Sequence, residues 1–429
     1  MFLQILFFVA ILALLGILVK QAREQRLAVI GLAVLIACLP LDNFWDINMP
    51  NFQDISIGVS SALVVLAFIL NKSRQFTWQP IFFLIVSIYL LNFVGLLHTG
   101  DFSLANKRID TMTPVIVFPV LFGMIQLAKR NVILLLRFFL WTVIAVCVYG
   151  LLSYAVAIDD FSWKMILLEG KRYAYLFTVG PIAQHPSALS IVLLMALPVS
   201  LYLRYHDGKQ ITRVEMLLAI VLPILVAFMV GARIAVAIFP VLLSLGYLFY
   251  CKFKQMLKWS LVALGVVALG VAIFLLPADI RERYSDPIRI DLRHAAVSAI
   301  KEKPILGWGT WQQTNFAMCE KRTDAWNSAA YRFPDHFHNV YLDYMMQFGI
   351  VGIAILLGLI FWIFGIAIRE KNFLLLSFVM MYVIIFYFDN VLQSPRFVVA
   401  FMFWFCFLIA NRKYLVERKT TMICQTNKK

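Results

Sequence analysis

The sequence is poor in charged residues. They make up 14% of its 429 positions, whereas 62% are hydrophobic and the mean hydropathy is +0.85. Soluble domains carry about a quarter charged residues, so this composition excludes an ordinary soluble domain. The six cysteines are scattered and form no CxxC motif, so no disulfide framework is predicted. The hydrolase motif GxSxG, the zinc-protease motif HExxH and any internal repeat are also absent.

Long apolar runs dominate the chain instead. About thirteen of them approach the roughly 17–25 residues that span a bilayer as a helix. They lie near 2–19, 27–41, 56–70, 80–97, 113–128, 132–157, 187–203, 214–231, 234–251, 259–276, 349–368, 373–390 and 397–411. No cleavage site of small residues follows the first run, so we expect a retained helix rather than a signal peptide. The sequence predicts an all-α polytopic integral membrane protein with about 12–13 transmembrane helices, whose phenylalanine-rich helices face lipid.

The net charge of +15 is explained by membrane orientation better than by nucleic-acid binding. With the C-terminus inside, the proposed inner loops and tail carry 21 of the 38 lysines and arginines, and the short outer loops carry 7. This is the positive-inside pattern. It predicts an outward-facing N-terminus and no nucleic-acid partner.

The chain divides into four regions within one membrane domain. Residues 1–276 hold helices 1–10, residues 277–337 form a large outer loop, residues 338–411 hold helices 11–13, and residues 412–429 form a basic inner tail. The large loop is expected to be partly helical. From Leu292 to Glu302 its apolar residues (292, 296, 297 and 300) have helical spacing, Pro304 ends the helix, and "GWGTW" reads as a turn.

Polar residues gather on the outer side. The stretch "DHFHNVYLDYMMQFG" (335–349) precedes an apolar run, and the topology places Arg233, Arg293 and Asp389 on the same side. Histidine titrates near neutral pH and can take a proton from a hydroxyl, whereas arginine binds phosphate through two parallel hydrogen bonds. The group therefore suits a lipid-diphosphate donor and a hydroxyl acceptor. Asp335, His336 and His338 offer an alternative zinc reading, but we predict neither a metal nor a cofactor.

Three stretches carry a resemblance to a known family. They are "VGARIAVAIFP" (230–240), "LRHAAVSAIKEKPILGWGT" (292–310) and "HFHNVYLDYMMQFGIVGI" (336–353). In this order they resemble the O-antigen ligases and polymerases of the bacterial cell envelope. The resemblance implies a multi-pass protein of the bacterial inner (cytoplasmic) membrane, with its large loop and its active site facing the periplasm.

The resemblance also implies a reaction and roles. A glycan would pass from undecaprenyl diphosphate to a hydroxyl of the lipid A–core oligosaccharide, with inversion at the anomeric carbon. His338 would be the catalytic base, and Arg233 and Arg293 would bind the donor diphosphate. The supporting residues would be His336, Asn339, Asp389 and His185.

Each of these residues also has a structural interpretation. His338 can instead be a helix-start residue, Arg233 a headgroup anchor, and Arg293 a member of a local ion pair. The family also contains polymerases and protein O-oligosaccharyltransferases, and the single large loop favours the ligase branch. A transporter or flippase of lipid-linked sugars would need a polar route through the membrane, whereas the polar residues here gather on one side.

Overall fold

The computed structural model describes residues 2–22, 25–41, 52–71, 75–99, 102–157, 186–206, 210–230, 232–250, 287–311, 337–392 and 395–416. All regular secondary structure within these ranges is helical. The first half holds α1 (Phe2–Gln21), α2 (Arg26–Cys38), α3 (Phe52–Leu70), α4 (Ile81–Leu96), α5 (Phe102–Thr111), α6 (Pro114–Met124) and α7 (Lys129–Ala157). The second half holds α10 (Pro186–Leu194), α11 (Ala196–Tyr205), α12 (Arg213–Met229), α13 (Arg233–Tyr250), α16 (Pro287–Glu302), α18 (Val340–Arg369), α19 (Phe373–Phe388), α20 (Pro395–Ala410) and α21 (Arg412–Leu415).

The helices follow the predicted apolar runs closely. Each predicted segment coincides with a helix or helix pair, except 259–276, which lies outside the described residues. Within the part of the chain that the structure describes, four helical spans are long and apolar enough to cross a membrane by length and composition: Phe2–Gln21, Lys129–Val156, Ala188–Tyr205 and Val340–Arg369. Shorter apolar helices accompany them. The fold is therefore an all-α polytopic membrane protein, as predicted, while the number of spanning helices and the region boundaries stay predictions.

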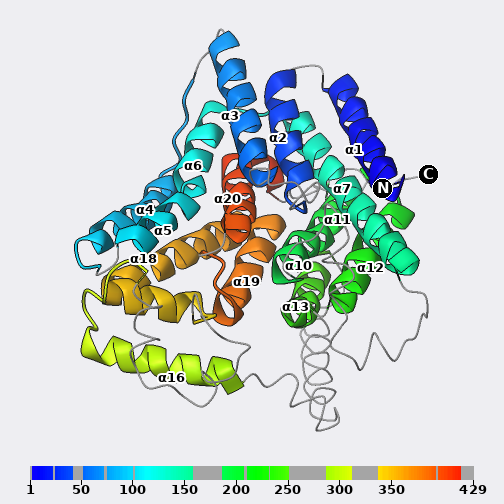
Figure 1. Cartoon of the computed structure of the whole chain (residues 1–429). Coiled ribbons are helices and arrows are strands. Elements are labelled where there is room, and N and C mark those ends of the chain that lie inside the picture. Colours follow the sequence, from blue (N-terminus) through cyan, green and yellow to red (C-terminus); the bar gives the residue numbers. More distant parts are fainter. Residues whose placement is uncertain are drawn as a thin grey trace, which may run out of the picture.

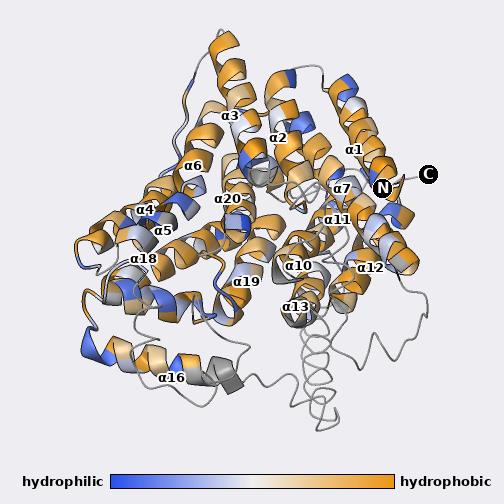
Figure 2. Cartoon of the chain, viewed as in Figure 1, coloured by the Kyte–Doolittle hydropathy of each residue, from blue (hydrophilic) through white to orange (hydrophobic). Residues whose placement is uncertain are grey.

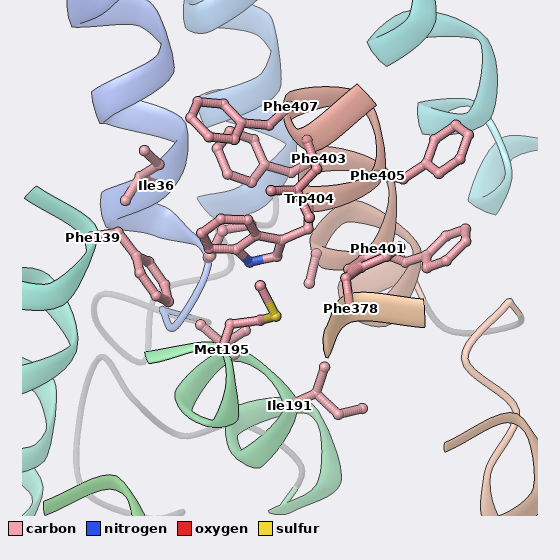
Figure 3. Close-up of a cluster of buried hydrophobic side chains, with 14 of the residues drawn as sticks. Ile36, Phe139, Ile191, Met195, Phe378, Phe401, Phe403, Trp404, Phe405 and Phe407 are labelled. Atoms are coloured by element: carbon pink, nitrogen blue, oxygen red, sulfur yellow. The ribbon is translucent and has the colours of Figure 1, made fainter. Parts of the chain in front are cut away.

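Helix α20 lies near the middle of the assembly in Figure 1 and packs against α6, α19 and α10. Every residue from Phe397 to Ile409 is buried, because a helix that is apolar on all sides is stable only when neighbours surround it. Figure 3 shows Trp404 among Phe139, Met195 and Ile36 of three other segments. The Trp404 and Phe139 rings meet edge to face, 4.7 Å between centroids.

This burial corrects the expectation that phenylalanine-rich helices face lipid. The side chains of Phe83 and Phe361 are each 67% exposed, as that expectation requires. The phenylalanines of α20 are buried instead, and among the described helices α20 has the most of them. Hydropathy alone does not separate a lipid-facing helix from a central one, since both are apolar. Helix α1 is the contrasting case: it packs on α7 and α2 and leaves Phe2 and Leu12 exposed.

Helix α16 lies against the first part of α18 and mixes polar with apolar residues, as its colours in Figure 2 show. Its apolar face forms a small cluster with the segment before α18. The cluster contains Leu292, Ala296, Ala299, Ile300, Phe337 and Met346. The helix predicted from Leu292 to Glu302 is confirmed and begins earlier, at Pro287, while Val297 is 41% exposed and lies off the buried face that contains Ala299. At about 3.6 residues per turn, position 299 lies above 292 and 296, whereas 297 points away.

Helix α18 is interrupted at Gly349. This glycine has φ 60° and ψ −152°, outside the helical range, so a polar first part (340–348) precedes the apolar run that was predicted to begin at 349. A β-carbon at Gly349 would lie 2.2 Å from the carbonyl oxygen of Ile305, so only glycine fits.

The turn that follows α16 forms backbone hydrogen bonds with the residues on both sides of this interruption. The backbone N–H groups of Trp308 and Gly309 donate to the carbonyls of Met346 and Gln347, each at 2.9 Å, and Ile350 N–H donates to Pro304 O at 2.9 Å. Backbone groups that the break removes from the helix thus find partners in the turn. The predicted "GWGTW" turn is confirmed, and it fixes α16 to the first part of α18.

Candidate functional site

His338 sits at the start of α18 in an unusual backbone conformation. Its φ of 51° lies in the left-handed region, which few residues other than glycine, asparagine, aspartate and histidine adopt. The next residue, Asn339, caps α18 by accepting a hydrogen bond from Leu342 N–H at 3.0 Å. Its side-chain amide donates to the carbonyl of Tyr387 at 3.1 Å. Asn339 therefore joins the start of α18 to the end of α19 and fixes the residue beside it.

Asp389 ends α19 and faces the same histidine. Its Oδ1 accepts the N–H of Asn390 at 2.8 Å and lies 3.4 Å from Nδ1 of His338. The Asp389 side chain is 5% exposed, whereas that of His338 is 26% exposed. A buried carboxylate thus contacts an imidazole ring that is partly exposed. Such an arrangement orients the ring.

Arg293 approaches this pair from α16. Its guanidinium carbon lies 4.8 Å from the centre of the Tyr387 ring, and its Nη1 donates to the Tyr387 hydroxyl at 3.3 Å. Tyr387 is two residues before Asp389, and its carbonyl is the partner of Asn339. The structure therefore brings together Arg293, His338, Asn339 and Asp389, all predicted site residues, around the end of α19.

Arg233 is placed only by its backbone. It begins α13, which packs against α19. The Phe249 and Tyr250 rings, at the far end of α13, contact Phe373 at the start of α19. The two helices therefore run in opposite directions, and the start of α13 lies at the same end of the pair as Asp389.

Two predicted residues, His185 and His336, lie outside the described residues. The predicted roles of these two histidines stay predictions. Among the described residues there is no group of three or more histidine, cysteine, aspartate or glutamate side chains that could hold a metal ion.

The sequence reading missed Tyr387 and the buried residues Arg108 and Asp343. Tyr387 directly precedes the "FDN" stretch that contains Asp389, so its position in the sequence could have identified it as a candidate. Arg108 was counted only as one of the basic residues in outer loops. Nothing in its local sequence separates it from an exposed loop arginine.

A pocket of about 370 Å³ opens where α3, α6 and α20 begin. Its polar lining includes Asp54, Asp110, Thr111 and Thr113, with Pro395 on the α20 side. It contains none of the predicted site residues. Its lining therefore shares no residue with the site formed by His338, Asp389 and Arg293.

Comparison with protein families matches residues 218–357 to the family described as O-antigen ligase. No curated protein matched the chain. The matched segment holds Arg233, Arg293, His338 and Asn339 and excludes Asp389. It does not separate the ligase branch from the polymerase branch. Through residues 218–357 the chain belongs to the O-antigen ligase family, and this match implies glycosyltransferase activity in general.

Proposed function

We propose that this protein transfers a glycan from undecaprenyl diphosphate to a hydroxyl of the lipid A–core oligosaccharide. The observation that carries the proposal is the contact between His338 and Asp389, with Arg293 on the adjoining tyrosine. Family membership supports the general activity. The donor, the acceptor and the role of each residue are proposed here.

His338 is the general base of the reaction. With Nδ1 directed at Asp389, Nε2 is the nitrogen that takes the proton of the acceptor hydroxyl. The acceptor oxygen then forms a bond to the anomeric carbon as the bond from that carbon to the diphosphate oxygen breaks. The electron pair of the broken bond leaves with undecaprenyl diphosphate. A single displacement of this kind inverts the anomeric configuration.

Arg293 and Arg233 bind the donor diphosphate. The leaving group gains negative charge in the transition state, and fixed cations stabilise that charge most where water is excluded. The planar guanidinium of Arg293 is oriented by the Tyr387 ring beneath it and the hydroxyl at its edge. Two arginines supply the charge that a metal supplies in other diphosphate sites, so we propose that transfer is metal-independent.

The site faces the periplasm in this proposal. The positive-inside distribution supports an outer position in the inner membrane for the end of α19 and the start of α18. There a lipid-linked donor in the outer leaflet and the lipid A–core acceptor can both reach His338.

The testing experiment is transfer by the purified protein in chelator. The protein is mixed with undecaprenyl-diphosphate glycan and lipid A–core, and products are separated by size. Ligated lipopolysaccharide is the expected product. Chain growth from donor alone would instead identify a polymerase, and glycan on a supplied protein acceptor would identify a protein O-oligosaccharyltransferase. Movement of the donor between leaflets without any product would identify a transporter.

A further inference from the structure

Arg108 is a fully buried arginine on the short polar helix α5. Its side chain is 1% exposed, although arginine is almost never fully buried unless it is paired. Burial lowers the pKa of Arg108, and the electrostatic interactions with Tyr344 and Asp343 oppose that shift. The position lies outside the segment that matches the O-antigen ligase family.

One contact of Arg108 reaches the turn that carries Asp389. Its Nη1 donates a hydrogen bond to the backbone carbonyl of Leu392. Leu392 belongs to the buried turn between α19 and α20, three residues after Asp389. The guanidinium therefore holds the segment that places the Asp389 carboxylate.

A second interaction of Arg108, which is electrostatic and not a hydrogen bond, reaches the segment that carries His338. The guanidinium interacts with Asp343, which is 0% exposed in the first part of α18. Oδ1 of Asp343 accepts the backbone N–H of Phe337 at 3.5 Å, and Phe337 directly precedes His338. Arg108 thus acts on both partners of the His338–Asp389 contact without touching either.

Stability alone does not explain a buried arginine here. A buried charge is weak support for a fold, because the cost of desolvation offsets its attraction to neighbouring groups. Nε and Nη2 of Arg108 and Oδ2 of Asp343 also make no hydrogen bond of ordinary geometry. Trp311, whose ring centre lies 5.8 Å from the guanidinium carbon, completes the surroundings.

We propose that Arg108 is a positioning residue, which holds the Leu392 turn and the Phe337 segment in the register that brings His338 against Asp389. The proposal rests on the proposed function for its catalytic consequence. A displacement of about 1 Å at a catalytic pair costs about 100-fold in rate, so the loss of this link is expected to lower kcat. The donor KM is expected to stay within about twofold, because Arg108 does not touch the donor in this account.

The first test compares R108Q and R108K with the control N106A, whose side chain is exposed on the same helix. Rates are measured per folded protein. We expect kcat to fall about 100-fold in R108Q and about 10-fold in R108K, because lysine keeps the charge but cannot make two separate planar contacts. N106A is expected to match the wild type. A wild-type kcat in R108K would overturn the proposal. If R108Q does not fold, R108K alone carries the test.

A double-mutant cycle with D389N separates positioning from a general structural role. In the D389N background the contact with His338 is already impaired, so R108K is expected to lower kcat by less than twofold further. Full multiplication of the two single effects would overturn the proposal.

A cross-linking readout is independent of activity. Variants H338C and D389C are combined in a chain whose native cysteines are alanine, and a short bifunctional thiol reagent joins them. The yield is expected to fall several-fold when R108K is added, and an unchanged yield would overturn the proposal. A wild-type protein without any transfer activity would refute the proposed function, while this yield still decides whether Arg108 positions the two segments.

Discussion

Nδ1 of His338 lies 3.4 Å from Oδ1 of Asp389, although the two residues are 51 positions apart in the chain. One precedes α18 and the other ends α19, and the Asn339 bridge to the Tyr387 carbonyl joins the two helix ends beside them. A carboxylate in this place fixes the tautomer and orientation of the imidazole and stabilises the ion formed when it takes a proton. The reactivity proposed for His338 therefore depends on Asp389.

Replacing Asp389 by asparagine is expected to lower kcat about 100-fold or more with little change in the donor KM. The amide still accepts the Asn390 N–H but no longer carries the charge that stabilises protonated His338. Steady-state transfer by purified D389N measures this. The control is D54N, since Asp54 is an exposed aspartate in the first turn of α3. Wild-type kcat in D389N would remove the carboxylate from the mechanism.

Substitutions of Arg293 and of Tyr387 are expected to lower kcat/KM for the donor by different amounts. R293K loses the planar guanidinium, so kcat/KM for the donor is expected to fall about 10-fold or more. Y387F removes one hydroxyl and keeps the ring under the cation, so kcat/KM is expected to fall less than about 10-fold, the value of one ordinary hydrogen bond. Donor titrations of both variants give the comparison. Equal losses, or none in R293K, would contradict a diphosphate contact by Arg293.

Gly349 is expected to tolerate no side chain. G349A places a β-carbon 2.2 Å from the Ile305 carbonyl oxygen at a φ of 60°, which is expected to lower the free energy of unfolding by about 3 kcal/mol or more. The matched control is G365A in the same helix, where a β-carbon meets nothing within 4 Å. It is expected to be neutral or to stabilise by up to about 1 kcal/mol. Unfolding of both variants in detergent checks the difference, and equal stabilities would show that the break in α18 does not need glycine.

The orientation in the membrane is tested by labelling single cysteines. In a chain with its native cysteines replaced by alanine, H294C on α16 is expected to react with an impermeant maleimide added outside intact cells. R369C at the end of α18 is expected to react only after the cells are opened. Both side chains are exposed, so burial does not explain a difference. The reverse pattern would invert the predicted topology.

Much of the fold could be predicted because hydropathy reports helix position directly. The limits of α12, α13 and α19 follow the apolar runs within a few residues. The first part of α18 was not predicted, because Asp343 and Gln347 interrupt its apolar pattern. The burial of α20 was not predicted either, because an apolar helix has the same sequence pattern whether lipid or protein surrounds it.

Some residues of the candidate site could be predicted from the sequence and others could not. His338, Arg293 and Asn339 stand in short stretches whose family resemblance could be read from the sequence, and the structure brings them together with Asp389. Arg108 and Asp343 could not be found in this way. Their meaning comes from contacts across the fold, to Leu392 and Phe337, that no local pattern encodes.

The most direct test of the account is the transfer rate of H338N against the wild type. Asparagine accepts the left-handed backbone of position 338, where φ is 51°, so the variant is expected to fold. It cannot take a proton, and the account predicts a loss of at least about 100-fold in kcat, with donor binding retained. Transfer by folded H338N at the wild-type rate would contradict the account, because the reaction would then proceed without an imidazole at position 338 to take the proton of the acceptor hydroxyl.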